Sequence, residues 1–543
     1  MAEKIVYYSE FGAVGDGVAE DFPAIVKCHE YANANGCKVM ADKGARYYIG
    51  ETGGISAIVK TDVDWQDATF IINDKVIDAD SKSRTVNIFT VLHDYPMVKH
   101  GADSEIVKAI NASGGIKADE IKNIGYAPGY PALLAVWDND NTAYRRWGVH
   151  ATGQPNPQVE VIVIDKDGNI DSSTPFLLNY VNVTHIEEYR IDDKPITITG
   201  GTFITDANCA PPKYTYYARG IGISRANVTI KNTVHDLIGE PIQESGLENG
   251  PKTGGAPYHA FIAWYYSYNL LIENVVFHGH RMYWEYTYDE SGKAIRVHSG
   301  MGSYDIGGRC STGITLLGCT QPDFYKDKEK NIAYCELERW GIMGSNYNKN
   351  ITYEKCRLSR LDAHAGIYNV TIKDCEITYI KLIGGGRALI ENTKVVCSER
   401  INMPFLELRG DYGSTWRGDI IIRNCEYLGV KENGGKYQEW KGNGVFIASV
   451  LWNNWPFGYK TYLPRIEIDN LFIDNPTDKV YVFDQMLKDT SEAIDMPVLN
   501  DGTKNENPMD ISTVVTVKNN TRGYIFEGSS NPYANSKITI KEI

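Results

Sequence analysis

Residues 359–365 of this 543-residue chain carry side chains that could perform chemistry on a sugar. Polar and apolar residues alternate there, so a strand would place Arg360, Asp362 and His364 on one face. His364 is also the only histidine after residue 298. An arginine beside the aspartate would keep that carboxyl ionised, and a histidine can move a proton near neutral pH. We therefore take these three residues as the centre of a candidate catalytic site.

Glycoside hydrolysis is the first reaction that these residues could perform. It needs one protonated carboxyl as acid and one ionised carboxyl as base or nucleophile, about 5–9.5 Å apart. Asp362 could be the ionised member, held so by Arg360 or Lys381. Glu407 or Asp305 would then be the acid. Several carboxylates in an acidic protein suit a neutral or weakly charged glycan, so hydrolysis by a glycoside hydrolase is the preferred interpretation.

Elimination or epimerisation at a uronate is the alternative reaction. A polysaccharide lyase needs a base at C5, a proton donor to the leaving oxygen and a cation on the carboxylate. His364 could be the base and Tyr379 the donor. Arg360 or Lys381 could neutralise the carboxylate. A further alternative has no catalysis at all: a glycan-binding protein of the tailspike kind.

The elements that would position these residues follow from an internal repeat. An eight-residue pattern, apolar at positions one and three and small or polar at position five, begins at Ile196, Val228, Leu270, Ile314, Ile351, Val370, Ala388, Ile420 and Ile466. The three starts from Ile351 to Ala388 are only 19 and 18 residues apart. A propeller blade needs about 40 residues, so these short units are rungs of a solenoid. The chain is predicted to be an all-β parallel β-helix.

Cysteines support the same register. Position six is occupied by Cys319, Cys356, Cys375 and Cys425, and Cys335 joins them one rung before Cys356. Free cysteine packs as a small hydrophobic residue. We therefore expect a ladder of small side chains inside the solenoid rather than disulfides or a metal site.

This register stacks the candidate residues across neighbouring rungs. Tyr379 aligns with Arg360 and Lys381 with Asp362, and Glu407 follows in about the same column one rung later. Rungs are about 4.8 Å apart, so the side chains should form one patch on the two shortest rungs. Longer neighbouring rungs carry aromatic residues that could stack on sugars. The predicted substrate-binding residues are Arg409, Arg339, Trp264, Tyr283, Trp284 and Trp452.

The N-terminal sequence FGAVGDGVAEDFPAI, residues 11–25, has glycines at turn positions, Asp21 as a helix N-cap and Pro23 in the first turn. A helix from there to about residue 34 would cap the first rung. With these features the chain resembles the pectin-lyase-like right-handed β-helix superfamily, over residues 5–75 and 196–475. The resemblance implies a polygalacturonase, polysaccharide lyase, epimerase or tailspike. Asp362-x-His364 is similar to the Asp-x-His of alginate epimerases, whereas the polygalacturonase motifs are not found as a set.

Four segments are predicted. Residues 1–75 form the N-terminal cap and first rungs, and residues 76–195 an inserted subdomain with irregular rungs. The insert should contain a helix over 103–112 and a hairpin strand over 159–165 with a turn at Asp167 and Gly168. Residues 196–475 form the regular β-helix with the groove, and residues 476–543 the C-terminal cap.

Composition limits the partners. With 55 Lys+Arg against 69 Asp+Glu the net charge is −14, which argues against a nucleic-acid or anionic-membrane binder. No apolar run is long enough to span a bilayer. A carbohydrate substrate is expected. The protein is expected to be a monomer or a homo-oligomer, with a trimer as one possible homo-oligomer. The first residues lack a signal-peptide pattern, which fits a cytoplasmic protein or a secreted one whose leader has been removed.

No cofactor is predicted, except that a lyase could use calcium. His278 and His280 have the spacing of two metal ligands on one strand face. With no third ligand in evident reach, we interpret them as structural and predict no metal site.

Overall fold

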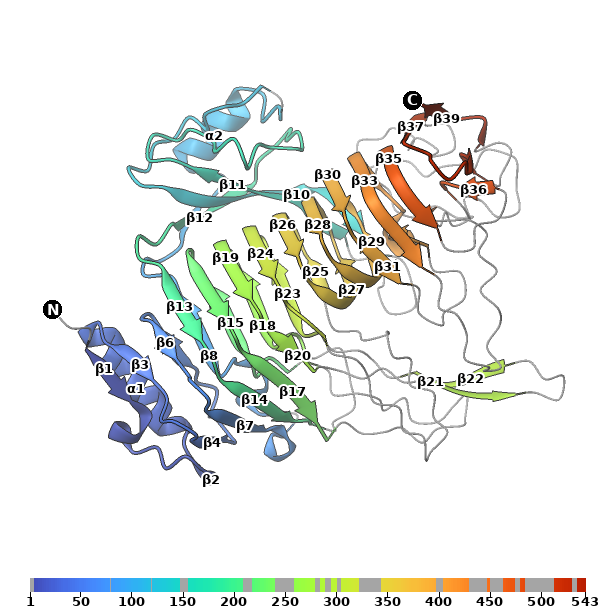
Figure 1. Cartoon of the computed structure of the whole chain (residues 1–543). Coiled ribbons are helices and arrows are strands. Elements are labelled where there is room, and N and C mark those ends of the chain that lie inside the picture. Colours follow the sequence, from blue (N-terminus) through green and yellow to red (C-terminus); the bar gives the residue numbers. More distant parts are fainter. Residues whose placement is uncertain are drawn as a thin grey trace.

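The nine repeats lie side by side as parallel strands (Figure 1). The computed structural model describes residues 4–78, 80–118, 120–146, 155–208, 217–239, 258–278, 284–288, 294–299, 304–321, 343–396, 404–428, 447–449, 462–473, 479–483, 512–529 and 535–543. The first residues of the repeats follow one another in one ladder, from Ile196 through to Ile466, in the predicted order. The chain is thus a right-handed parallel β-helix, as predicted.

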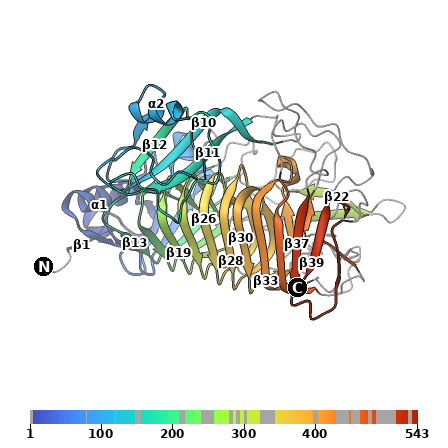
Figure 2. The same cartoon turned by 90° about the horizontal axis from the view of Figure 1, so that it is seen from above.

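The first column of strands contains these repeats. Its central members are β13 (Ile196–Thr199), β16 (Val228–Lys231), β19 (Tyr268–Glu273), β24 (Thr312–Leu317), β26 (Asn348–Glu354), β28 (Ile367–Lys373), β30 (Gly384–Glu391), β33 (Trp416–Leu428) and β35 (Arg465–Ile473). Apolar residues alternate with polar ones along each strand, so one side faces the interior. Figure 2 shows these strands stacked in a row along the helix axis.

Two further columns complete each rung. The second column includes β7 (Thr69–Asn73), β14 (Thr202–Asp206), β17 (Val234–Ile238) and β20 (Val276–Phe277). The third includes β5 (Ala57–Val59), β8 (Phe89–Leu92), β15 (Ile221–Ser224), β18 (Ile262–Tyr265), β23 (Ile306–Arg309), β25 (Met343–Ser345), β32 (Leu406–Leu408) and β34 (Ile447–Ser449). On the two shortest rungs, β27 (Arg357–Ala363) and β29 (Glu376–Leu382) run from the second column into the third.

The bend between the first and second columns is made by left-handed residues at position five of the repeat. Asn392 has φ of 49° and Asp374 has φ of 53°, a conformation that asparagine and aspartate tolerate better than most residues. The side chains also stack, since Asn392 Nδ2 donates to Asp374 Oδ1 at 3.0 Å. The same bond joins Asn470 to Asn424 at 2.9 Å. Backbone geometry and side-chain bonding therefore both favour asparagine here.

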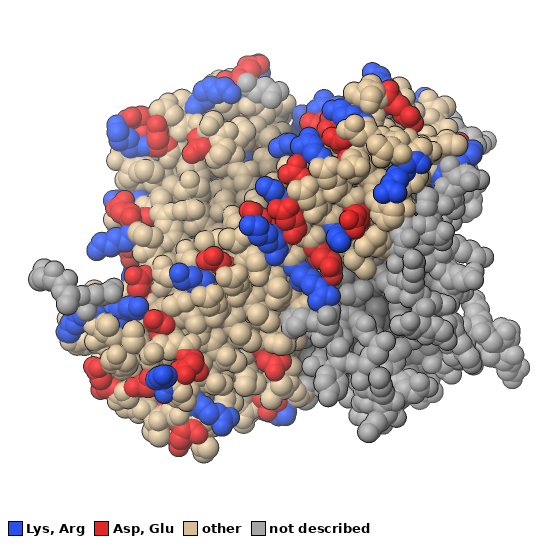
Figure 3. All heavy atoms as spheres, viewed as in Figure 1, with Lys and Arg blue, Asp and Glu red and all other residues tan. Residues whose placement is uncertain are grey.

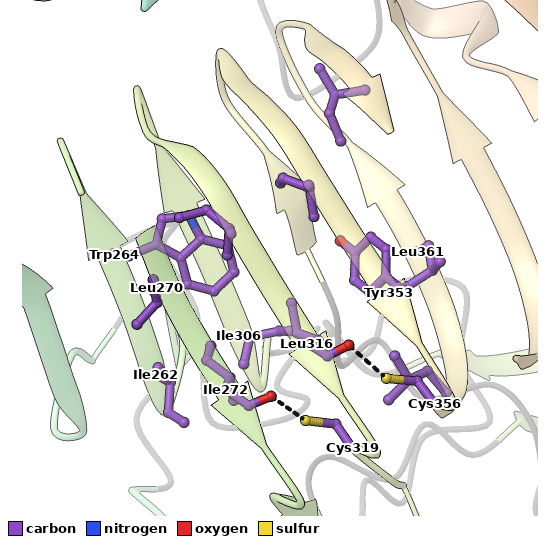
Figure 4. Packing of buried hydrophobic residues seen from close by; sticks show 14 of the residues in the cluster. Ile262, Trp264, Leu270, Ile272, Ile306, Leu316, Cys319, Tyr353, Cys356 and Leu361 are labelled. Atoms are coloured by element: carbon purple, nitrogen blue, oxygen red, sulfur yellow. Dashed lines mark hydrogen bonds between the residues drawn. The ribbon is translucent and has the colours of Figure 1, made fainter. Parts of the chain in front are cut away.

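The cysteine ladder lies inside the solenoid, as predicted. The thiols of Cys319, Cys356, Cys375 and Cys425 are free and buried. Each donates to a carbonyl of an earlier rung; Cys319 bonds Ile272 at 3.3 Å and Cys356 bonds Leu316 at 3.4 Å (Figure 4). The S–H group of each cysteine is hydrogen-bonded, and its sulfur fills space in the core. A small, weakly polar residue therefore suits position six. Cys335 lies outside the described residues.

The N-terminal end is capped by α1 (Phe22–Asn35), whose Phe22, Ile25 and Cys28 are buried against the first rung. Asp21 occupies the predicted N-cap position, and its carbonyl accepts from the backbone N–H of Ile25, but its side chain makes no capping bond to the helix. Its carboxylate instead accepts from the backbone N–H of Val14 at 2.6 Å and of Tyr48 at 3.2 Å. It therefore ties the glycine-rich turn to the neighbouring strand.

The insert forms an antiparallel sheet in the order β11-β10-β12-β9, with β9 (Val98–His100), β10 (Ala132–Arg145), β11 (Pro155–Ile164) and β12 (His185–Arg190). The predicted helix is α2 (Glu105–Ala112), capped by Ser104, and Gly168 makes the turn after β11 with φ of 81°. One sheet face packs on α2 and the other on the rungs. Figure 2 shows this inserted subdomain lying along the solenoid.

A buried ion pair fixes the inserted subdomain to the solenoid. Lys349 Nζ lies 2.5 Å from Glu160 Oε1, and both side chains are fully buried. Glu160 also accepts from the backbone N–H of Leu177 at 2.6 Å. Further along, the hydroxyls of Tyr144 and Tyr368 share a hydrogen bond of 3.1 Å. The insert is therefore bonded to β26 and β28, next to the rungs that carry the candidate site.

The far end of the solenoid is closed by β36 (Lys479–Tyr481), β37 (Thr513–Lys518), β38 (Ile525–Glu527) and β39 (Ile538–Glu542). The outer side of the first column carries cross-rung ion pairs, such as Arg423 with Glu391 and Glu467. Figure 3 shows both signs of charge intermixed on this side of the molecule. Within the described residues, no helix has the length and apolar character needed to cross a membrane.

Candidate functional site

The predicted stacking of polar side chains is present on β27, β29 and β32. Arg360 pairs with Tyr379 and Asp362 with Lys381 on the next rung. Lys381 in turn pairs with Glu407 on β32. Parallel neighbours are about 4.8 Å apart, so these side chains lie within contact distance of each other. Leu361 on the opposite face of β27 is buried in the core, as the alternation predicts.

Asp362 lies at the centre of this cluster and is fully buried. Oδ2 accepts from Arg360 Nη2, and Oδ1 accepts from Arg409 Nη1. His364 Nε2 lies 3.2 Å from Oδ2, and because an ionised carboxylate can only accept, the ring nitrogen is the donor. Burial alone would raise the pKa of Asp362, but Arg360, Arg409 and His364 outweigh it and hold that pKa well below its usual range. Asp362 is therefore an ionised anchor that fixes two guanidinium groups and an imidazole.

His364 lies next to Asp362 and has a side chain that can transfer a proton. Burial lowers the pKa of His364 to about 4, with Arg409 and Arg146 acting in the same direction and Asp362 against them. The imidazole is therefore neutral at pH 7. Its ring has Tyr304 and Tyr412 as aromatic neighbours, with ring centroids 6.3 Å and 6.2 Å away. Aromatic packing and the bond to Asp362 thus both contribute to fixing its orientation.

Tyr379, Lys381 and Glu407 form a second, more accessible part of the cluster. The Tyr379 hydroxyl donates to Glu407 Oε2, and Lys381 Nζ lies 2.8 Å from Glu407 Oε1. The side chains of Lys381 and Glu407 are 17% and 15% exposed, whereas that of Asp362 is 0% exposed. Arg360 lies over the Tyr379 ring at 5.5 Å and joins the two parts. A ligand would therefore meet Tyr379 and Lys381 before Asp362.

Asp305 occupies a buried position beside this cluster. It is 1% exposed, and its Oδ2 accepts from Gln321 Nε2 at 2.7 Å. Gln321 Oε1 accepts in turn from the backbone N–H and the hydroxyl of Ser359, at 2.7 Å and 2.8 Å. Asp305 thus supports the residue that precedes Arg360. The structure gives it the position of a supporting group rather than of an acid that faces a sugar.

Among the predicted sugar-stacking residues, Trp264 is wrongly assigned. It is 0% exposed and points into the interior (Figure 4). Its indole lies across the next rung, where a Cβ on Gly308 would come within 1.8 Å of Nε1. The alternation of β18 buries Ile262 and Trp264 together. Arg339, Tyr283 and Trp452 lie outside the described residues, as does the Trp284 side chain, whose backbone belongs to β21 (Trp284–Tyr288).

Three residues at the site were missed by the sequence analysis. Tyr412 follows Arg409 by one tight turn, and the Arg409 guanidinium lies 5.2 Å from its ring. The three-residue spacing of Arg409 and Tyr412 is visible in the sequence and could have placed Tyr412 at the site. Arg146 directly follows β10, two residues after Tyr144, and acts electrostatically on His364. No repeat covers the insert, and Tyr304 lies before β23, outside the eight-residue pattern, so only the folded structure brings Arg146 and Tyr304 to His364.

Metal binding receives no support from the part of the chain that the structure describes. No group of three or more His, Cys, Asp or Glu side chains there is arranged to hold a metal ion. The calcium that a lyase could use stays a sequence-based expectation, and His280 of the histidine pair lies outside the described residues.

The chain is similar in fold to solved structures of several kinds. The tailspike gp61 of Pseudomonas phage phi297 is 11% identical, with 99% of this chain and 84% of that chain covered and a TM-score of 0.45. The exopolygalacturonase of Thermotoga maritima is 10% identical, with 100% and 92% covered and a TM-score of 0.37. The A-module of the Azotobacter vinelandii mannuronan C-5 epimerase AlgE6 is 12% identical, with 87% and 100% covered and a TM-score of 0.32. No protein-family model and no curated protein matches the sequence.

Proposed function

We propose that the chain is a carbohydrate-active enzyme that acts on an acidic glycan by removing a proton from a uronate residue. The observation that supports this most directly is a neutral histidine held against an ionised aspartate and two arginines. His364 takes the C5 proton, and the cations of the cluster stabilise the negative charge that develops on the uronate carboxylate. Tyr379 donates a proton to the leaving oxygen when the glycosidic bond breaks.

Charge supports an acidic substrate. The described side chains of the cluster contribute three cations, Arg360, Arg409 and Lys381, against two carboxylates, Asp362 and Glu407. Arg146 adds a further positive charge near His364. In a chain with a net charge of −14, a locally positive cluster is suited to attract an anionic ligand.

Hydrolysis, the reaction preferred from the sequence, receives less support. A glycosidase needs one carboxyl with a raised pKa as the acid and a second that can reach water or the sugar. The pKa of Asp362 is lowered, its two oxygens accept from arginines, and its side chain has no exposed surface. Asp305 is buried against Gln321. Only Glu407 among these carboxylates is partly exposed, and it already accepts from Tyr379.

The test is turnover of polyuronates, namely polygalacturonate and alginate, in D2O, with neutral dextran in parallel. Ultraviolet absorbance from a C4–C5 double bond would identify a lyase, and deuterium at C5 without cleavage an epimerase; both support the proposal. New reducing ends without that absorbance would mean hydrolysis and overturn it. Binding without any product would overturn it in favour of a glycan-binding protein.

A further inference from the structure

A row of outward-facing side chains leads away from His364 along the helix axis. At each rung the third column ends in a residue with left-handed φ, between 46° and 61°: Tyr266, Cys310, Tyr347 and Ala365. The residues just before these are therefore successive members of one row: Tyr265, Arg309, Asn346 and His364. Backbone pairing confirms their order, since Tyr265 pairs with Arg309 and Arg309 with Asn346, while Ser345 pairs with Ala363. Arg309 is thus two rungs, or about 10 Å, from His364.

Arg309 differs from the buried arginines of the chain in its electrostatic partners. Arg219 and Arg225 each pair with a buried aspartate, as Arg360 and Arg409 do. Arg309 is partly buried, and it makes no ion pair with any carboxylate of the described residues. Its Nε is buried without a hydrogen-bond partner among them. A partly desolvated guanidinium without a carboxylate is the group that a carboxylate ligand would satisfy.

The inserted subdomain holds this arginine in place. The Arg309 guanidinium lies 5.4 Å from the Trp137 ring of β10, and His185 stacks on that ring at 5.3 Å. One rung earlier, Tyr266 stacks on Tyr189 of β12 at 4.5 Å. The row therefore runs next to the inner strands β10 and β12 of the insert, where aromatic rings of both parts meet. Fixed cations cost less entropy on binding than mobile ones.

We propose that Arg309 binds the carboxylate of a second uronate residue, so that the glycan lies along the helix axis from His364 towards Tyr265. This inference rests on the proposed function, because it extends the same site. The rise between rungs is comparable with the spacing of successive sugar residues. Asn346 lies one rung from Arg309 and one rung from His364, so it would contact the sugar between the two anchored residues.

The experiment measures binding of oligogalacturonates, from disaccharide to hexasaccharide, by calorimetry. The full chain carries His364→Ala so that no turnover occurs, and Arg309→Gln is added in one arm. In the parent, affinity should rise about tenfold or more with length, and Arg309→Gln should remove most of that gain. Arg423→Gln, on the outer side of the first column, is the matched control and should leave the length dependence unchanged.

The outcomes separate the two proposals. The role of Arg309 would be overturned if short oligomers bind and affinity increases with oligomer length as much with Arg309→Gln as without it. The proposed function would then still stand. No binding at any length by the parent would overturn both. Arg309→Lys keeps the charge but loses the two-pronged geometry, and it should give an intermediate gain. That variant decides the question if Arg309→Gln does not fold, as judged by thermal unfolding.

Discussion

Arg409 and Asp362 are joined by a buried ion pair across 47 positions of the sequence. Arg360 reaches the same carboxylate from two residues away. One aspartate therefore balances two guanidinium groups that are almost removed from water. Such an arrangement is stable only while all of its members are present, because a buried charge without its partner is costly.

Asp362→Asn should for this reason lower the free energy of unfolding by about 3–5 kcal/mol, since it leaves two arginines without their counter-charge. Denaturant unfolding followed by circular dichroism measures the loss. Asp419→Asn is the control, because Asp419 and its partner Arg465 are 44% and 72% exposed and such pairs contribute about 0–1 kcal/mol. Equal losses in the two variants would show that Asp362 is not the anchor of the cluster.

Stability should fall as the pH decreases from about 6.5 to about 4, in part through His364. Burial first, and then Arg409, lower the pKa of His364 to about 4, so the unfolded chain binds a proton in this interval and the folded chain does not. The contribution of the neutral histidine is thus complete above the unfolded pKa and is lost as the pH falls towards the folded one. A shift of this size corresponds to about 3 kcal/mol.

His364→Gln should reduce this dependence on pH. Burial also lowers the pKa of His29 and of His259, so the unsubstituted chain and the His364→Gln variant both lose some stability in acid. The quantity to measure is the difference between their two stability losses. Urea unfolding at several pH values gives it. If the two curves run parallel, His364 does not titrate as its surroundings require.

The fold was largely predictable from the sequence because the repeat carries its own register. Apolar residues at positions one and three, and a bend at position five, are local features that recur at every rung. Once Ile351 is aligned with Val370, the pairing of Arg360 with Tyr379 follows by counting. Stacking across rungs is therefore readable wherever the rungs are short.

What the sequence could not reveal is which side chains the fold removes from water. Alternation placed Asp362 on the outer face of β27, yet two arginines and the residues around them bury it completely. Trp264 was expected at the surface, but it fills the interior over Gly308. Arg146 depends on how the insert docks, and no repeat specifies that contact.

Turnover of a polyuronate should persist in acid further than an ordinary histidine base would allow. The acid limb of kcat/KM reports the base of the free enzyme, and the pKa of His364 is about 4. We expect kcat/KM to be level from about pH 7 to about pH 5 and to fall below that. His364→Gln should lower it about a hundredfold or more at every pH. An acid limb centred near the ordinary histidine pKa of about 6.5 would assign the base to another group.

Glu160 and Lys349 should behave as one unit when they are substituted together. Glu160→Gln alone leaves the buried Lys349 without a counter-charge, and Lys349→Met alone leaves the buried Glu160 without one. Each should cost about 3–5 kcal/mol of unfolding free energy. The double variant removes both charges, and its amide oxygen can still accept from the Leu177 N–H, as Glu160 does at 2.6 Å. It should therefore recover much of the stability that either single change loses. A double variant as unstable as the sum of the two single losses would mean that the two charges stabilise the protein independently, and that their contact does not hold the insert on the solenoid.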